Sequence, residues 1–125
     1  SPLASERSQL EVEALLALGR HDEALLRLDG MSLGDTPRSA ERHVVRGELR
    51  ARARRWGEAG ADFDQALAHV KGISIWHERA LWGRAMVRLQ AADKTDARAD
   101  LQLYLQTYPK GRFSRDAARL LAAGR

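Results

Sequence analysis

Apolar residues recur along the chain three and four positions apart, and glycine or proline interrupts each run. Side chains with this spacing share one face of a helix, so each run predicts an amphipathic helix with one buried side. No stretch shows the strict apolar–polar alternation or the β-branched enrichment that is typical of a strand. The sequence therefore predicts an all-α fold.

Seven helices are expected, separated by turns at glycine or proline positions. Residues 30–38 are expected to form a loop, and the third helix should run from about Ser39 to about Arg55. The apolar faces expected to be buried are Leu10, Ala14, Ala17 and Leu18; Ala24, Leu25 and Leu28; Ala59, Phe63, Ala66, Leu67 and Val70; Trp76, Leu81, Trp82, Ala85, Met86 and Leu89; Ala97, Leu101, Tyr104 and Leu105; and Ala117, Leu120 and Leu121.

Part of this pattern repeats within the chain. Gly83, Ala97 and Leu101 follow three similar residues at separations of 36 to 38 positions, and those residues are Gly47, Ala59 and Phe63. Repetition at this period favours stacked helix pairs over a closed bundle. Small residues let two helices approach closely, and the bulky side chains at 63 and 101 are expected to fill the gaps between successive pairs.

The segment with Gly47, Ala59, Phe63 and Ala66 resembles a tetratricopeptide repeat. That family places a small residue in the first helix of a pair, followed after the turn by alanine, an aromatic residue and another alanine. Residues 18–24 resemble the turn of the same family. The third pair is similar at Gly83, Ala97, Leu101 and Pro109, with two extra residues expected in its turn and Tyr104 in place of a small residue.

The resemblance implies one domain over residues 1–125, a right-handed superhelix of three helix pairs at about 4–29, 38–71 and 74–109. A polar-faced helix at 114–123 is expected to cap the array. In the family, the first helices of the pairs line a concave groove that binds a segment of a partner protein. Carried onto this sequence, the proposed partner-binding residues are Glu13, Val44, Glu48, Arg52, His77, Arg84, Val87 and Arg88. Arg84 and Arg88, four residues apart, are expected to contact an acidic segment of that partner.

Arg46 and Arg50 occupy positions where the resemblance implies large apolar side chains. Burying two unpaired guanidinium groups would be costly. Either the arginines pair with Asp62 and Asp64 of the next helix, or the third helix is rotated relative to this alignment. The sequence leaves both interpretations open.

The formal net charge is +4, and arginine carries most of the basic excess. An arginine-rich stretch at 50–55 makes a nucleic-acid-binding accessory domain the alternative function. Acidic residues are mixed with the basic ones, and no aromatic residues are interleaved in the stretch. These features favour protein binding, and nucleic acid is not the expected partner.

No motif predicts catalysis, a cofactor or a metal site. Residues 30–34 match the G-x-S-x-G pattern of hydrolases, but that motif needs a strand before the serine, and here a helix precedes it. The four histidines are scattered without metal-ligand spacing, and cysteine is absent. We therefore expect a non-enzymatic interaction or scaffolding module.

No apolar run reaches the roughly 20 residues that a membrane helix needs. The sequence starts at Ser1 without methionine, so we expect a piece of a longer, bacterial polypeptide. Residues 104–113 resemble repeats of bacterial envelope proteins that scaffold other envelope components. This likeness favours the periplasm or cell envelope over the cytoplasm.

Overall fold

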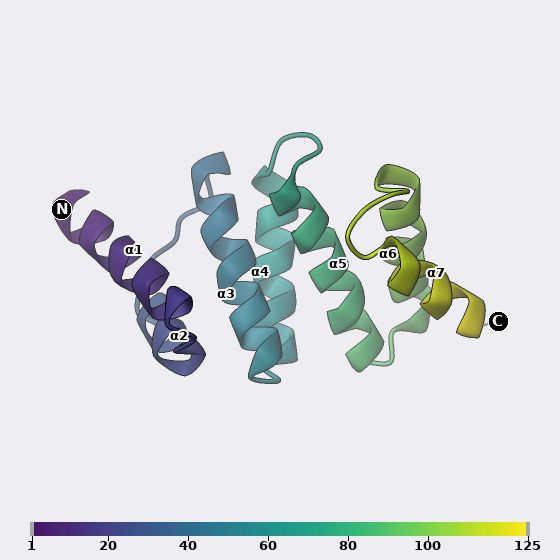
Figure 1. The fold of residues 1–125 in the computed structure, drawn as a ribbon, viewed down its shortest axis with the longest axis horizontal. Coiled ribbons are helices and arrows are strands. Elements are labelled where there is room, and N and C mark those ends of the chain that lie inside the picture. Colours follow the sequence, from purple (N-terminus) through teal and green to yellow (C-terminus); the bar gives the residue numbers. More distant parts are fainter. Residues whose placement is uncertain (1, 125) are drawn as a thin grey trace. The chain divides into compact units, whose positions relative to one another are not determined.

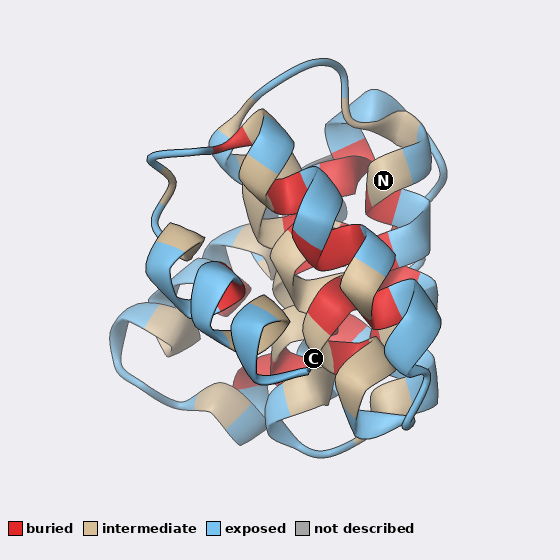
Figure 2. Cartoon of the chain, turned by 90° about the vertical axis from the view of Figure 1, so that its right-hand side faces the viewer, coloured by how far each residue is buried: buried red, intermediate tan, exposed pale blue. Residues whose placement is uncertain are grey.

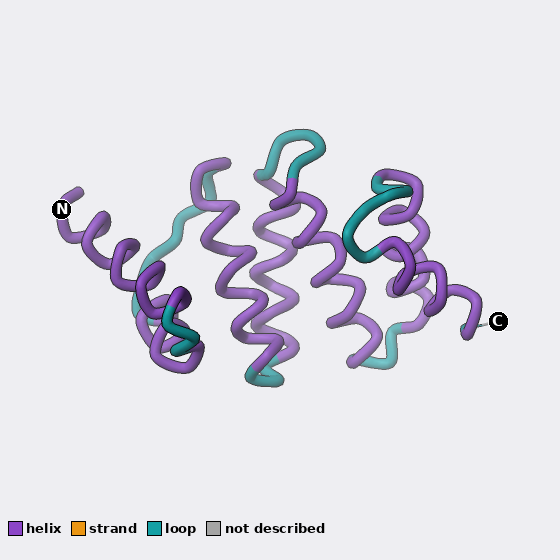
Figure 3. The backbone as a smooth tube through the Cα atoms, in the orientation of Figure 1, coloured by secondary structure: helices purple, strands orange, loops and turns teal. Residues whose placement is uncertain are grey.

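The computed structural model describes the backbone of residues 2–124. All regular structure in this part of the chain is helical, and none of it is a strand (Figures 1 and 3). The α-helices are α1 (Pro2–Ala17), α2 (His21–Asp29), α3 (Ala40–Arg52), α4 (Trp56–His69), α5 (Ile75–Gln90), α6 (Lys94–Thr107) and α7 (Ser114–Ala123), with a 3-10 turn at Pro37–Ser39. The prediction of an all-α fold is confirmed.

The chain divides into two compact units, and the boundary along the sequence lies between Leu33 and Gly34. In the N-terminal unit, α1 packs against α2. Helix α2 buries its predicted residues Ala24, Leu25 and Leu28. The prediction of a single domain over residues 1–125 stays a prediction.

The face predicted for the first helix is wrong. Leu10 and Leu18 are about two-thirds exposed, Ala14 and Ala17 are exposed, and Val12 is buried instead. Residues 14–18 are apolar without interruption, so several rotations of α1 give a similar periodic match. The apolar pattern alone therefore did not determine the rotation of this helix.

In the C-terminal unit each helix from α3 to α7 packs against the next one, and α3 also packs against α5. Figure 2 shows the buried residues on the sides of the helices that face their neighbours. One core cluster lies around Phe63 in α3, α4 and α5, and a second lies around Leu101 and Tyr104 in α5, α6 and α7.

Phe63 has the position predicted for it. A Cβ atom added to Gly47 of α3 would lie 2.8 Å from the phenyl ring, and one added to Gly83 of α5 would lie 2.4 Å from it. The ring therefore fills the space between one helix pair and the next, where only glycine leaves room.

The two pairs of the C-terminal unit repeat with a constant offset of 38 residues. Thr36 caps the turn before α3 by accepting from the backbone N–H of Ser39, and Ser74 caps α5 in the same way for His77. Helix α3 begins at Ala40, so the predicted start at about Ser39 is confirmed, and Ser39 also forms the second half of the capping box of the 3-10 turn. The helix ends at Arg52, three residues before the predicted end at about Arg55.

The turns within the pairs also correspond. Arg54 and Ala92 both have a positive φ, 62° and 59°, and the residue after each donates its N–H five residues back to a carbonyl of the preceding helix. Gly19 gives the N-terminal unit the same turn at φ 73°. Such hydrogen bonds are typical of α-helices that end with one residue in the left-handed backbone conformation. The expected two extra residues in the third turn are therefore wrong, because the partner of Gly47 in this register is Ala85 rather than Gly83.

Candidate binding surface

Asp62 of α4 is buried and holds three basic side chains of α3. Its carboxylate accepts from Arg46 at 2.9 to 3.2 Å and from Arg50 at 2.9 Å. His43 Nδ1 lies 2.9 Å from the same carboxylate. The first interpretation of Arg46 and Arg50 is thus confirmed for Asp62, while Asp64 lies on another face of α4 and contacts Arg84.

Both ring nitrogens of His43 face hydrogen-bond acceptors. Nδ1 contacts Asp62, and Nε2 lies 2.7 Å from the carbonyl oxygen of Gly34. A neutral imidazole donates through one nitrogen only, so both contacts are hydrogen bonds only when the ring carries two protons. His43 therefore links the loop before α3 to the buried carboxylate of α4.

Asp100 of α6 is the counterpart of Asp62 in the next pair. It is also buried and accepts from Arg84 at 2.9 and 3.0 Å and from Arg88 at 2.8 Å. The three charged positions lie 38 residues after Arg46, Arg50 and Asp62. In the N-terminal unit, Glu11 of α1 pairs with Arg27 of α2. The separation of these two residues along the chain is the same as that of Arg46 and Asp62, but the acidic and basic positions are exchanged.

Several predicted partner-binding residues are engaged inside the protein. Val44 is fully buried and Val87 is 8 % exposed, both in the core around Phe63. The expectation that these two valines line an open groove is wrong, because their side of each helix packs against neighbouring helices. Arg84 and Arg88 are partly buried and pair with Asp100, so they have a structural role, and their contact with an acidic segment of a partner stays a prediction.

The remaining predicted residues are more accessible. Glu13 and Arg52 are exposed on α1 and α3. Glu48 of α3 is partly exposed and accepts from Arg79 of α5, whose guanidinium also lies 4.6 Å from the centre of the Trp76 ring. Their role in binding a partner stays a prediction.

His77 belongs to a hydrogen-bonded group at the start of α5. Its Nδ1 lies 2.6 Å from the Tyr108 hydroxyl, and burial together with the charge of Arg84 lowers the pKa of its imidazole. The nearby Tyr104 hydroxyl donates to Glu78 and accepts from the backbone N–H of Phe113. Burial and the bond to Glu78 raise the pKa of Tyr104 to about 12. The tyrosine therefore stays protonated and ties the segment before α7 to α5.

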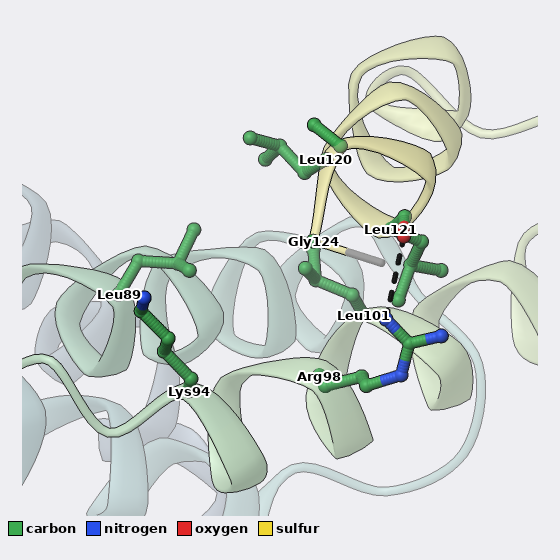
Figure 4. A pocket seen from close by; sticks show the side chains of 8 residues that line it. Leu89, Lys94, Arg98, Leu101, Leu120, Leu121 and Gly124 are labelled. Atoms are coloured by element: carbon green, nitrogen blue, oxygen red, sulfur yellow. Dashed lines mark hydrogen bonds between the residues drawn. The ribbon is translucent and has the colours of Figure 1, made fainter.

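A groove of about 490 Å³ opens where the ends of α5, α6 and α7 meet (Figure 4). Leu89 comes from α5, Leu101 from α6, and Leu120 and Leu121 from α7. The other lining residues are Lys94, Arg98, Ala123 and Gly124. Arg98 donates to the carbonyl oxygen of Leu121 at 3.3 Å. The groove thus combines leucine side chains with two basic groups.

The preceding helix pair shows why this groove is open. In the 38-residue register, Lys94 and Arg98 replace Trp56 and Gly60. Trp56 packs against the core around Phe63, and a Cβ on Gly60 would lie 3.3 Å from Val87. An aromatic residue that packs on the core and a glycine close to α5 are therefore replaced in α6 by two long cationic side chains that line the groove.

Sequence reasoning did not single out Lys94 and Arg98. The signal was present in a comparison of the second and third pairs at constant offset. The 38-residue separations of Ala97 and Leu101 from Ala59 and Phe63 already place Lys94 and Arg98 opposite Trp56 and Gly60, but the sequence reasoning considered the positions that match and not those that differ.

The described residues include no group of three or more histidine, aspartate or glutamate side chains placed to hold a metal ion. Ser32 lies in the loop after α2, as predicted. None of the described helices combines the length and apolar character needed to cross a membrane. The chain matches no family model, no curated protein and no solved structure.

Proposed function

We propose that this chain is a non-enzymatic protein-interaction module built from tetratricopeptide-like helix pairs in a right-handed superhelix. The constant 38-residue register, the repeated turns and the packing of α3 against both α4 and α5 support this architecture. In such an array, each helix pair buries its apolar face against its neighbours, and side chains left at the surface are available to a partner.

The observation that carries the proposal is the groove at α5, α6 and α7. It offers leucine side chains beside two cationic groups, whereas the arginines on the inner faces of α3 and α5 are neutralised by Asp62 and Asp100. Concave sites with apolar walls and a few polar groups are typical of ligand binding.

The same ion pairs argue against the alternative of nucleic-acid binding. Arg46 and Arg50 contribute to the basic character of α3, and both contact Asp62. Phosphate binding depends on cations that release counterions from the nucleic acid, and an arginine already paired with a carboxylate contributes less to that effect.

The test is selection of binders from a random 12-residue peptide display library, followed by titration of synthetic copies monitored by fluorescence anisotropy. A shared motif and saturable binding would support the proposal. In parallel, single- and double-stranded oligonucleotides are titrated at about 50 and 200 mM salt. Failure to enrich any peptide, combined with oligonucleotide binding that weakens steeply with salt, would overturn it.

A further inference from the structure

We propose that the groove at α5, α6 and α7 binds a polypeptide segment in which apolar side chains flank a carboxylate. This inference rests on the proposed function and specifies the chemistry of the partner. It is carried by three observations: the unpaired charges at the groove, the apolar side chains that line it, and its open form.

The first observation is the charge. Lys94 and Arg98 make no ion pair with any residue that the structure describes, although Asp93 and Asp96 lie on the same end of α6. Asp93 instead caps the helix by accepting from the backbone N–H of Asp96 at 3.3 Å. Asp93 and Asp96 offset the formal charges of Lys94 and Arg98 at this end of α6, and Arg98 also donates to the carbonyl oxygen of Leu121. The group left for a partner is therefore chiefly the exposed ammonium of Lys94, next to the positive end of the α6 dipole. A carboxylate is the complementary group.

The second observation is the apolar lining. Leu101 is buried at the base, and the accessible apolar surface comes from Leu120 and Leu121, which are half-buried against the core around Tyr104. Leu89 completes the lining from α5 (Figure 4). Binding is favoured when a partner removes apolar surface of this kind from water. Apolar side chains next to the carboxylate would make that contact.

The third observation is the form of the site. A volume of about 490 Å³ accommodates a few side chains, and the groove lies between helix ends that open to solvent. An acyl chain would need an enclosed apolar cavity to be removed from water along its length. A peptide places two or three side chains in such a groove and keeps its backbone at the surface. The geometry therefore favours a peptide over a fatty acid.

The probe is a fluorescent acetylated peptide with the core Leu-Glu-Leu-Leu, compared with peptides that carry Gln or Lys in place of Glu. Decanoate is titrated separately. We expect saturable binding of the Glu peptide and about tenfold weaker binding of the Gln peptide, because one charge-assisted contact is lost. Backbone amide shifts in the complex should include Leu89, Lys94 and Leu120.

The critical variant is Lys94→Glu, with Lys110→Glu as the matched control at an exposed lysine outside the groove. Lys94→Glu should weaken the Glu peptide at least tenfold and strengthen the Lys peptide, while Lys110→Glu leaves both unchanged. Equal effects of the two variants would overturn the groove assignment.

Two further outcomes separate this inference from the proposed function. If library-selected peptides bind but neither depend on Glu nor respond to Lys94→Glu, the groove inference fails and the protein-binding function holds. If decanoate alone binds and shifts the groove amides, the peptide assignment is overturned. Lys94 is exposed, so its substitution is not expected to unfold the protein, and circular dichroism verifies this for each variant.

Discussion

The helix pairs α3–α4 and α5–α6 have the same turns and ion pairs at an offset of 38 residues, but they differ in how far their inner side chains are shielded from solvent. Asp62 and Asp100 occupy equivalent positions, and each is buried beneath two arginines. The arginines over Asp62 are 13–14 % exposed, whereas those over Asp100 are 23–29 % exposed. The same frame thus supports a sealed contact in one pair and an open edge in the next.

The difference has a steric origin as well as an electrostatic one. Phe63 occupies the space between Gly47 and Gly83, whereas Leu101 lines the groove. A repeated frame therefore fixes the ion pairs and turns, while a few changed side chains decide where the surface remains open. The predictions below test whether the two pairs differ in stability as they differ in closure.

The largest expected effect is that of Phe63→Ala. Truncation removes a ring that contacts both neighbouring helices and leaves a closed cavity, so the free energy of unfolding should fall by about 4 kcal/mol. Leu101→Ala should cost about 2 kcal/mol, because its cavity joins an open groove that can be filled by solvent or by small shifts. Chemical unfolding followed by circular dichroism measures both.

Leu103→Ala is the control for this comparison, since Leu103 lies on the exposed side of α6. It should change stability by less than about 0.5 kcal/mol. Equal losses for the Phe63 and Leu101 variants would show that the two pairs are closed to the same degree.

The next effect concerns the buried carboxylates. Asp62→Asn keeps the size of the side chain but removes the charge that balances Arg46 and Arg50, and we expect a loss of about 3 kcal/mol. Each pair keeps a second acid, Glu58 for Arg50 and Asp64 for Arg84. Asp100→Asn should cost about 2 kcal/mol, because the arginines over Asp100 are more exposed than those over Asp62.

Asp64→Asn serves as the control for an exposed carboxylate and should cost less than about 1 kcal/mol. Thermal and chemical unfolding of the three variants at low and high salt gives the comparison. A larger loss for Asp100→Asn than for Asp62→Asn would reverse our assignment of the sealed pair.

The smallest effect is a pH dependence in the α5–α6 pair. His77 stands where the α3–α4 pair has Ser39, and its pKa is lowered from 6.5 in the folded protein. The unfolded chain therefore binds the proton first as pH falls below about 6.5, and stability from this position is lost toward lower pH. His77→Gln should reduce the fall in melting temperature between pH 7.5 and 5.5.

His69→Gln is the control at a histidine on α4, and it should leave the contribution of His77 in place. An identical pH profile for wild type and His77→Gln would contradict the role assigned to the His77 imidazole. Melting is followed by circular dichroism at constant ionic strength, so that salt effects do not mimic the titration.

The sequence predicted the helices correctly, and it predicted a contact correctly where a side chain had few possible partners. Phe63 stands between glycine positions, so the spacing led to the ring contact. Buried arginines needed an acid within reach, so the sequence named Asp62 and Asp64 as candidates and left a rotated third helix as the alternative. The rotation of α1 was not predictable in this way, because its apolar run offers several faces.

The candidate groove depended on information that single residues do not carry. Lys94 and Arg98 are ordinary surface residues when considered separately. They become informative only beside Trp56 and Gly60 at an offset of 38 residues, and the matching turns at Arg54 and Ala92 confirm that offset. The burial of Val44 and Val87 likewise depended on tertiary packing.

The exchanged charges of the Glu11–Arg27 pair affect how the chain avoids wrong helix pairings while it folds. If α1 paired with α4 in the same frame, Glu11 would face Asp62, and if α3 paired with α2, Arg46 would face Arg27. Like charges at close range oppose both arrangements, whereas the native partners attract. The sign of the charge at these positions thus disfavours pairing of either N-terminal helix with the equivalent helix of the α3–α4 pair.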